Sequence, residues 1–377
     1  MDNSAVDNTA YQAELEAGKQ AARTGLTEEG RVHLERAVSL AHDDAEAAEA
    51  LARLGRVYAM LGNYPEAERV LREALQRAAN SPAAMAEARL QMGTVRWLQG
   101  EMKTARAFLE QAQADFKRLG LARERASTLT NLGLVLKNMG EYQRAIDAFE
   151  ESRQLGEALE DWPGMIINGN NLGECLCDLG ALPRAEALFR RCLDLAVERD
   201  LPAVSIDTRR NLGRLLGETG ALDEARRHIE QAIEMARQFQ RPYLHAQALA
   251  SLAEVWLAQG DATRAHALAE ELLALAGNAA NYRARGRLIL GRCALARGDG
   301  TQALVTLQEG LLDAQAAYSE MLILRFHAAL SQVVDHPAIA QVHRRIAHEL
   351  AEQIADGLAD KALRQIFRAS ALFRSIG

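Results

Sequence analysis

Three asparagines recur at a spacing of 40 residues in the middle of the chain, at Asn131, Asn171 and Asn211. Each lies two positions before a small residue that we expect to pack inward between two helices. Its side chain is therefore expected to project toward the concave side of an array of stacked helices. An amide offers both a hydrogen-bond donor and an acceptor, which suits it to hold the backbone of an extended ligand. The alternative is that each asparagine satisfies a neighbouring helix of the same chain. Because three stand in register, we favour the interpretation that they contact a ligand.

Charged residues of both signs surround these asparagines at neighbouring concave positions. A basic clamp for a ligand carboxylate needs several converging Lys or Arg side chains, and the candidates here are Lys137, Arg210 and Arg214. The alternative for any one charge is a solvated face with internal ion pairs, such as Arg214 with Glu174 or Glu218. The candidate ligand-binding residues are Asn131, Asn171, Asn211, Asn170, Lys137, Asn138, Glu174, Asp178, Arg210, Arg214 and Trp97. For the tryptophan among them, the alternative is packing within the array.

No constellation of residues in the sequence fits a catalytic or metal centre. Cys175 and Cys177 stand two apart, so on a helix they point roughly 200° apart, and no second pair completes a metal site. His348-Glu349 lacks the second histidine that a zinc protease motif needs. The sequence has no glycine-rich phosphate loop, and no Ser or Cys stands in a recognisable nucleophile turn. We therefore expect no enzyme, no metal and no cofactor.

Net charge and composition exclude further classes of function. The 377 residues carry a formal net charge of −7 with a pI near 5.8, so no cationic excess is available to neutralise a phosphate backbone. No run of about 18 apolar residues occurs, and the N-terminus lacks the basic-then-apolar layout of a secretory signal. Four irregularly spaced cysteines agree with a reducing compartment. We expect a cytoplasmic protein that binds neither nucleic acid nor membranes.

The elements that position these side chains come from an internal repeat. A small residue recurs every 38 or 40 residues, and a joint glycine follows seven residues after each one. Apolar residues keep helical spacing on both sides of the joint glycine, which predicts two antiparallel helices and a left-handed residue between them. Such a period predicts a solenoid of stacked helix pairs. The small residues are Gly55, Gly93, Gly133, Gly173, Gly213, Ala253 and Gly291, and the joint glycines are Gly62, Gly100, Gly140, Gly180, Gly220, Gly260 and Gly298.

The ends of the repeat set the expected organisation of the chain. The prolines agree with the repeat register, because they fall in the first turn of a second helix or between units. We expect a disordered N-terminus over 1–9, a repeat array over 10–317 and capping helices over 318–377. Within the array, 10–43 is a degenerate first unit and 44–317 holds the clear units.

Two units carry a recognisable order of small, bulky and aromatic residues. They are Leu54-Gly55-Tyr58-Gly62-Tyr64-Ala67-Leu71-Ala74 and Leu132-Gly133-Leu136-Gly140-Tyr142-Ala145-Phe149. This order resembles the tetratricopeptide repeat (TPR) family over about residues 15–317. Later units depart from it, since Leu182 and Leu222 replace the tyrosine and Ala253 replaces the glycine. The period near 40 exceeds the common one of about 34 and resembles the variant in kinesin light chains, spindle-orientation adaptors and bacterial peptide-sensing regulators.

The resemblance implies a fold and a class of function. It implies an all-α, right-handed superhelical solenoid of about seven or eight helix-turn-helix TPR units with a C-terminal helical cap. The family binds peptides or helices in its concave groove, which implies a protein- or peptide-binding scaffold or adaptor. An alternative is a ligand-responsive sensor in bacterial signalling that controls a signalling ATPase, a transcription factor or another effector, since the C-terminal tail resembles repeat regions of such proteins. A further alternative is a structural protein that self-associates into a homo-oligomer through its unequal ends.

Overall fold

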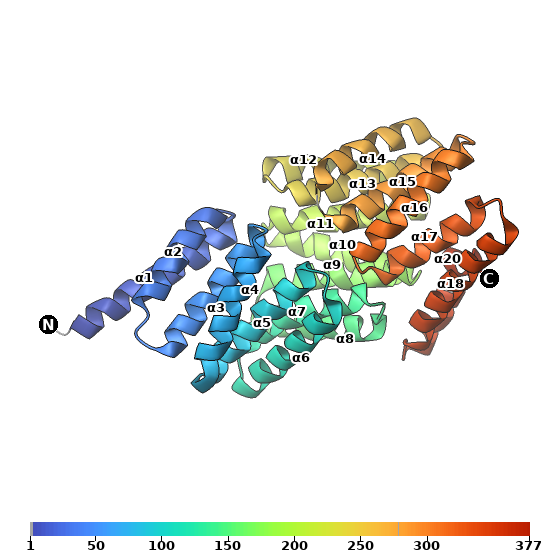
Figure 1. Cartoon of the computed structure of the whole chain (residues 1–377). Coiled ribbons are helices and arrows are strands. Elements are labelled where there is room, and N and C mark those ends of the chain that lie inside the picture. The colour runs from blue at the N-terminus through green and yellow to red at the C-terminus, as the bar shows by residue number, and fades with distance from the viewer. Residues whose placement is uncertain (1–2, 278) are drawn as a thin grey trace. The chain divides into compact units, whose positions relative to one another are not determined.

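The computed structural model describes residues 3–277 and 279–377, and every regular element in them is a helix (Figure 1). The helices form two compact units, which divide between Val135 and Leu136 within α7 (Ala122–Asn138). The elements before α7 are α1 (Asn3–Thr24), α2 (Thr27–Leu40), α3 (Asp44–Met60), α4 (Tyr64–Arg77), a 3-10 turn (Ala78–Asn80), α5 (Pro82–Leu98) and α6 (Met102–Leu119).

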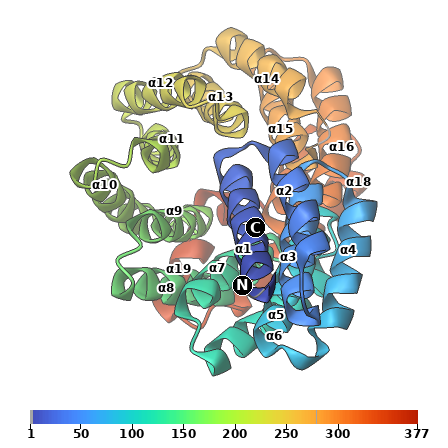
Figure 2. The same ribbon diagram turned by 90° about the vertical axis from the view of Figure 1, so that its left-hand side faces the viewer.

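The second unit holds the remaining helices. They are α8 (Tyr142–Ala158), α9 (Trp162–Asp178), α10 (Leu182–Glu198), α11 (Pro202–Glu218), α12 (Leu222–Gln238), α13 (Pro242–Ala258), α14 (Ala262–Ala276), α15 (Ala280–Ala296), α16 (Gly300–Ala316), α17 (Glu320–Val333), α18 (Pro337–Asp356), α19 (Lys361–Arg368) and α20 (Ala371–Arg374). Figure 2 shows α9 to α16 following an arc, with the odd-numbered helices on its inside.

This order of elements confirms the expected all-α solenoid of helix-turn-helix units. Eight consecutive helix pairs, α1/α2 to α15/α16, precede the C-terminal helices. Helix α1 begins at Asn3, inside the range 1–9 for which the sequence predicts disorder, and it is anchored where the Tyr11 hydroxyl donates to the Glu46 carbonyl at 2.9 Å. Residues 1 and 2 lie outside the described residues. None of the described helices combines the length and apolar character that crossing a membrane requires.

The small residue of a unit leaves room for a bulky side chain sixteen positions later, on the second helix of the pair. A Cβ added to Gly93 would lie 2.8 Å from Leu109 Cγ, closer than real Cβ atoms approach a neighbour. The same relation joins Gly18 to Leu34 at 2.6 Å in the α1/α2 pair. Glycine therefore permits the close approach of the two helices, and the degenerate first unit packs as the clear ones do.

The joint glycines adopt the left-handed conformation predicted for them. All seven have positive φ, from 72° at Gly140 to 88° at Gly220. A residue with a Cβ pays a steric cost there that glycine avoids. This conformation ends the first helix of each pair and turns the chain back into the second.

Two glycine-to-alanine substitutions are expected to change stability in opposite directions. Gly220→Ala should destabilise the fold by about 1 kcal/mol, because alanine resists a φ of +88°. Gly300→Ala should stabilise it by about 0.5–1 kcal/mol, because Gly300 starts α16, has no neighbour within 4 Å of an added Cβ, and loses backbone entropy on folding. Urea unfolding followed by circular dichroism measures both. Equal effects of the two substitutions would contradict the assigned role of the joint glycines.

The C-terminal helices return to the beginning of the second unit. Gln143, at the start of α8, accepts hydrogen bonds from the backbone N–H groups of Ala359 (3.1 Å) and Asp360 (3.3 Å). Arg184 on α10 forms an ion pair of 3.4 Å with Asp360. A Cβ on the joint Gly180 would lie 3.1 Å from Ser370 Cβ. The segment from α18 to α20 therefore covers helix ends of the same unit and does more than close the last repeat (Figure 2).

A histidine pair between α17 and α18 should make the second unit sensitive to acid. Burial, reinforced by His343, lowers the pKa of His327 from 6.5 to about 4, and the two Nδ1 atoms lie 2.8 Å apart. Between these pH values the unfolded chain binds a proton that the folded chain does not. The free energy of unfolding is therefore unaffected by this histidine above pH 6.5, and it decreases by up to about 3 kcal/mol as the pH falls toward 4. Urea titrations from pH 7 to pH 4 should show this slope, and His327→Gln should flatten it; an unchanged slope would contradict the assignment.

Candidate functional site

The inner face of the second unit gathers side chains from successive first helices. We define the inner face as the side of α9, α11, α13, α15 and α17 that points away from the paired second helices. In an α-helix, positions −6, −2, +1 and +5 from the small residue fall within roughly 60° of one another, on the side opposite the close helix contact. This geometry assigns Asn171 and Asn211, at position −2, to the same side of their helices as position +1, which Glu174 holds on α9; Asn131 holds position −2 on α7, in the first unit.

A chain of ion pairs joins the end of α7 to the inner helices α9 and α11. Lys137 Nζ at the end of α7 lies 2.5 Å from a Glu174 carboxylate oxygen on α9, and Arg210 on α11 lies 2.8 Å from the other one. Arg210 also pairs with Asp207 at 3.1 Å. Burial alone would raise the pKa of Glu174, but Lys137 and Arg210 outweigh it and hold that pKa well below its usual range. Glu174 is therefore ionised and shared by two cations.

Asp178 links this chain of ion pairs to the C-terminal helices. Its carboxylate accepts from the Tyr142 hydroxyl at 3.0 Å and pairs with Arg325 of α17, also at 3.0 Å. Farther along, Arg214 pairs with Glu218 at 2.8 Å, which is one of the two ion pairs that the sequence suggests for it. The five predicted charges in this unit all have partners in the chain, and each of the three basic candidates has at least one carboxylate partner.

The predicted asparagines have different surroundings. Asn131, in the first unit, donates to Thr94 Oγ1 at 3.1 Å, which is the neighbouring-helix contact of the alternative interpretation. Asn170 donates to Thr208 Oγ1 at 3.0 Å, and its buried Oδ1 has no partner. Asn211 is 1% exposed, and neither atom of its amide has a partner. Asn171 is half-buried, and its side chain forms no hydrogen bond with described residues.

Two predicted residues lie outside the inner face, and two residues that were not predicted belong to it. Asn138 and Trp97, the latter in the first unit, are half-buried. Sequence reasoning missed Arg325, because only the fold returns α17 to Asp178. It also missed Arg285, although position −6 from Gly291 places it in the register of Asp207 on α11.

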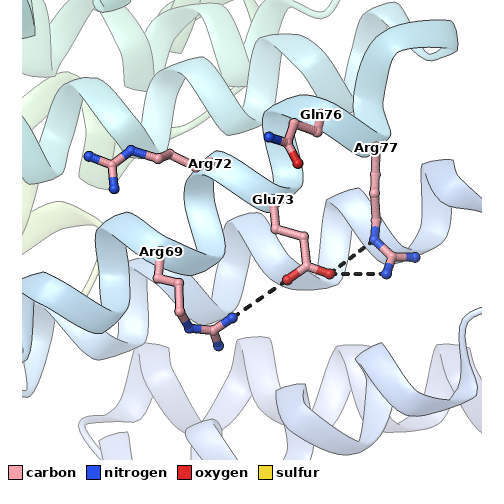
Figure 3. A pocket seen from close by; sticks show the side chains of 5 residues that line it. All are labelled: Arg69, Arg72, Glu73, Gln76 and Arg77. Atoms are coloured by element: carbon pink, nitrogen blue, oxygen red, sulfur yellow. Dashed lines mark hydrogen bonds and ion pairs between the residues drawn. The ribbon is translucent and has the colours of Figure 1, made fainter.

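Within the described residues, the cysteines, the metal-binding residue types and a hollow on α4 lack the features of a functional site. All four cysteines are buried and unbonded, and burial raises the pKa of Cys175 to about 12. In the described part of the chain, no cluster of three His, Cys, Asp or Glu residues could hold a metal ion. An open hollow on α4 contains arginines, but Figure 3 shows Arg69 and Arg77 both paired with Glu73.

Comparison with known proteins agrees with this architecture. The family model of the MalT-like TPR region matches residues 121–366, and a tetratricopeptide repeat model matches residues 48–81. A search of curated proteins finds no match.

Three solved structures share the fold at low sequence identity. A Rap protein complexed with competence and sporulation factor is 14% identical, with a TM-score of 0.69 over 92% of this chain and 99% of that one. NprR in complex with its cognate peptide NprX is 14% identical, with a TM-score of 0.68 over 93% and 100% of the two chains. A STAND protein with a tetratricopeptide repeat sensor from Pyrococcus horikoshii is 13% identical, with a TM-score of 0.57 over 88% of this chain and 49% of that one.

Proposed function

This chain belongs to the MalT-like TPR region family, and we propose that it is a cytoplasmic peptide-binding protein that holds an extended ligand on the inner face of its second unit. The observation that carries the proposal is a set of polar side chains on three of the inner helices that lack partners among the described residues. Asn171 on α9, Asn211 on α11 and Arg285 on α15 are at least half-buried and form no hydrogen bond or ion pair with described residues. Buried polar groups normally have hydrogen-bond partners, so a polar ligand would supply the partners that these side chains lack.

The structural neighbours support this proposal at the level of ligand class. One is described with the competence and sporulation factor and another with its cognate peptide. Their fold extends over nearly the whole of this chain. The polar inner face suits the backbone of a peptide better than an apolar helix, because amide and guanidinium groups recognise carbonyl and carboxylate oxygens.

The proposal is tested with a synthetic pool of random-sequence heptapeptides passed over the immobilised full chain. We expect the wild-type chain to retain a subset of peptides, identified by mass spectrometry. A variant with Asn171→Ala and Asn211→Ala together should retain them at least tenfold less while its circular dichroism spectrum is unchanged, because the peptide groups that these two amides bind lose their hydrogen-bond partners. Unchanged retention by this variant would contradict the asparagine contacts, and no retention by the wild type would contradict peptide binding.

A second candidate function is a regulatory sensor, favoured by the return of the C-terminal helices onto α8 and α10. The ion pair of Arg184 with Asp360 is largely exposed, and exposed ion pairs contribute little to stability. The buried Asn211 amide is covered, so a ligand reaches it only if neighbouring helices separate. Small-angle scattering with and without a retained peptide tests this function. A change in the radius of gyration supports a sensor that changes shape, and an unchanged radius supports a static scaffold.

A further inference from the structure

The C-terminal helices bring the end of the second unit back to its beginning. Each unit of a repeat array contacts its nearest neighbours, so the two ends of an array need not meet. Here Arg325 on α17 pairs at 3.0 Å with Asp178 at the end of α9, which lies 147 residues earlier in the chain. A Cβ added to the joint Gly140 would lie 3.3 Å from Glu320 Cβ and 3.4 Å from Ile354 Cγ1. The start of α17 and the end of α18 therefore lie against the joint that precedes α8 (Figure 2).

The joint between α9 and α10 is apolar where the C-terminal helices cover it. Leu179 and Ala181 stand on either side of the joint Gly180 and are 0% and 2% exposed. At the joint between α13 and α14, the place of Leu179 is held by Gln259, which is half-buried. Gly180 has no side chain to keep Ser370 away, since an added Cβ would lie 3.1 Å from Ser370 Cβ. This joint thus has the residues of a contact surface, whereas the α13/α14 joint has a polar residue facing water.

The contacts between the two ends are local and largely polar. Gln143 on α8 accepts hydrogen bonds from the backbone N–H groups of Ala359 and Asp360, and the exposed Arg184 on α10 pairs with Asp360. Within the described residues, none of the helices α17 to α20 packs closely along α8, α9 or α10, as the paired helices of one unit do. An exposed ion pair stabilises little, and the net contribution of a single hydrogen bond is small. Separating the two ends therefore costs less free energy than unfolding a repeat.

Asp178 connects these contacts to the ion pairs of the inner face. Its side chain is 14% exposed, and besides pairing with Arg325 it accepts a hydrogen bond from the Tyr142 hydroxyl at 3.0 Å. Lys137 Nζ lies 4.0 Å from the Asp178 carboxylate and 2.5 Å from the Glu174 carboxylate. One cation thus stands between the carboxylate that holds α17 and the carboxylate that holds α11. A change at Asp178 therefore reaches both the contact between the ends and the charges of the inner face.

We infer that these contacts form a clasp between the two ends of the second unit, which opens and closes while the helices stay folded. The clasp consists of the Asp178–Arg325 ion pair and the contacts of residues 359, 360 and 370 with α8 and α10. Small rotations between neighbouring units can part the ends without unfolding any unit. The clasp then sets how widely the inner face is opened. This inference goes beyond the proposed function, because the clasp forms whether or not a ligand is present.

The test measures the distance between two spin labels on the full chain by pulsed electron resonance, with Arg191→Cys on α10 and Gln365→Cys on α19 as the labelled parent. Both positions are exposed, and the four native cysteines are buried, so the labels attach at these two sites. We expect a main distance from the closed clasp and a minor, longer one from the open clasp. Arg325→Gln should raise the population of the longer distance about tenfold, because Asp178 loses its charged partner on α17. About 1 M salt should raise the same population in the parent, because salt screens the exposed ion pair.

The control variant is Arg345→Gln, which removes the same charge from an exposed arginine that pairs with Glu349 on its own helix, α18. Its distances should equal those of the parent, and Arg325→Lys, which keeps the charge but not the planar fork, should fall between the parent and Arg325→Gln. Circular dichroism reports whether the helices persist in each variant. Distances in folded Arg325→Gln that equal those of the parent overturn the clasp. If Arg325→Gln loses its helices, the salt titration of the parent decides, and distances that stay constant up to about 1 M salt overturn the clasp.

Discussion

Glu174→Gln is expected to lower the free energy of unfolding of the second unit by about 3–5 kcal/mol. The substitution keeps the shape of the side chain and removes the charge that Lys137 and Arg210 share. Arg210 is only 3% exposed, so it cannot turn to water when its partner is lost. Arg210 then keeps only Asp207, at 3.1 Å, and a buried cation that loses one of its two carboxylates costs more than the loss of an exposed pair.

Hydrogen exchange of α9 and α11 backbone amides in the full chain measures this effect, because it reports local free energies even when the two units unfold separately. The control is Glu186→Gln on α10, where Arg190 is exposed and keeps Glu224 as a second partner at 3.1 Å. Its expected cost is at most about 0.5 kcal/mol. Comparable costs for the two variants would show that the Glu174 network is solvated and does not hold α7, α9 and α11 together.

Much of the fold follows from periodic residues whose role is local. The joint glycines and the spacing of apolar residues determine where each helix ends, and the structure places left-handed residues at all seven joints. Such signals need no knowledge of distant contacts.

The candidate site could be predicted only in part, because pairing depends on distances between units. Register identified Glu174, Arg210 and Asp178 as inner residues, but not which cation each carboxylate binds. Arg325 pairs with Asp178, which lies 147 residues earlier in the chain, and the repeat pattern cannot predict such a contact. Position −6 holds residues of either charge, so register alone could not separate Arg285 from paired residues. The absence of a partner becomes visible only when all neighbouring side chains are placed.

The close contact between Gly173 and Phe189 is expected to show strong coupling in a double-mutant cycle. A Cβ on Gly173 would overlap the Phe189 ring, which is fully buried, so Gly173→Ala should cost about 1–3 kcal/mol by overpacking. Phe189→Ala should cost about 3–5 kcal/mol by leaving a cavity. A later unit has alanine at both corresponding positions, and Ala253 and Ala269 are both fully buried in one apolar cluster, so two small residues are accommodated there.

The double variant Gly173→Ala/Phe189→Ala should therefore cost less than the sum of the two single variants by about 1 kcal/mol or more. The added methyl group no longer meets the ring, and it fills part of the space that the ring leaves. Hydrogen exchange of the α9 and α10 backbone amides, measured at increasing urea concentrations, gives the free energies of unfolding of the three variants. Additive costs would mean that α9 shifts away from α10 to accept the methyl group, and that the small residue does not fix the distance between paired helices. Coupling of the expected sign would identify the residue pair sixteen positions apart as the element that sets this distance in each unit, and with it the width of the inner face.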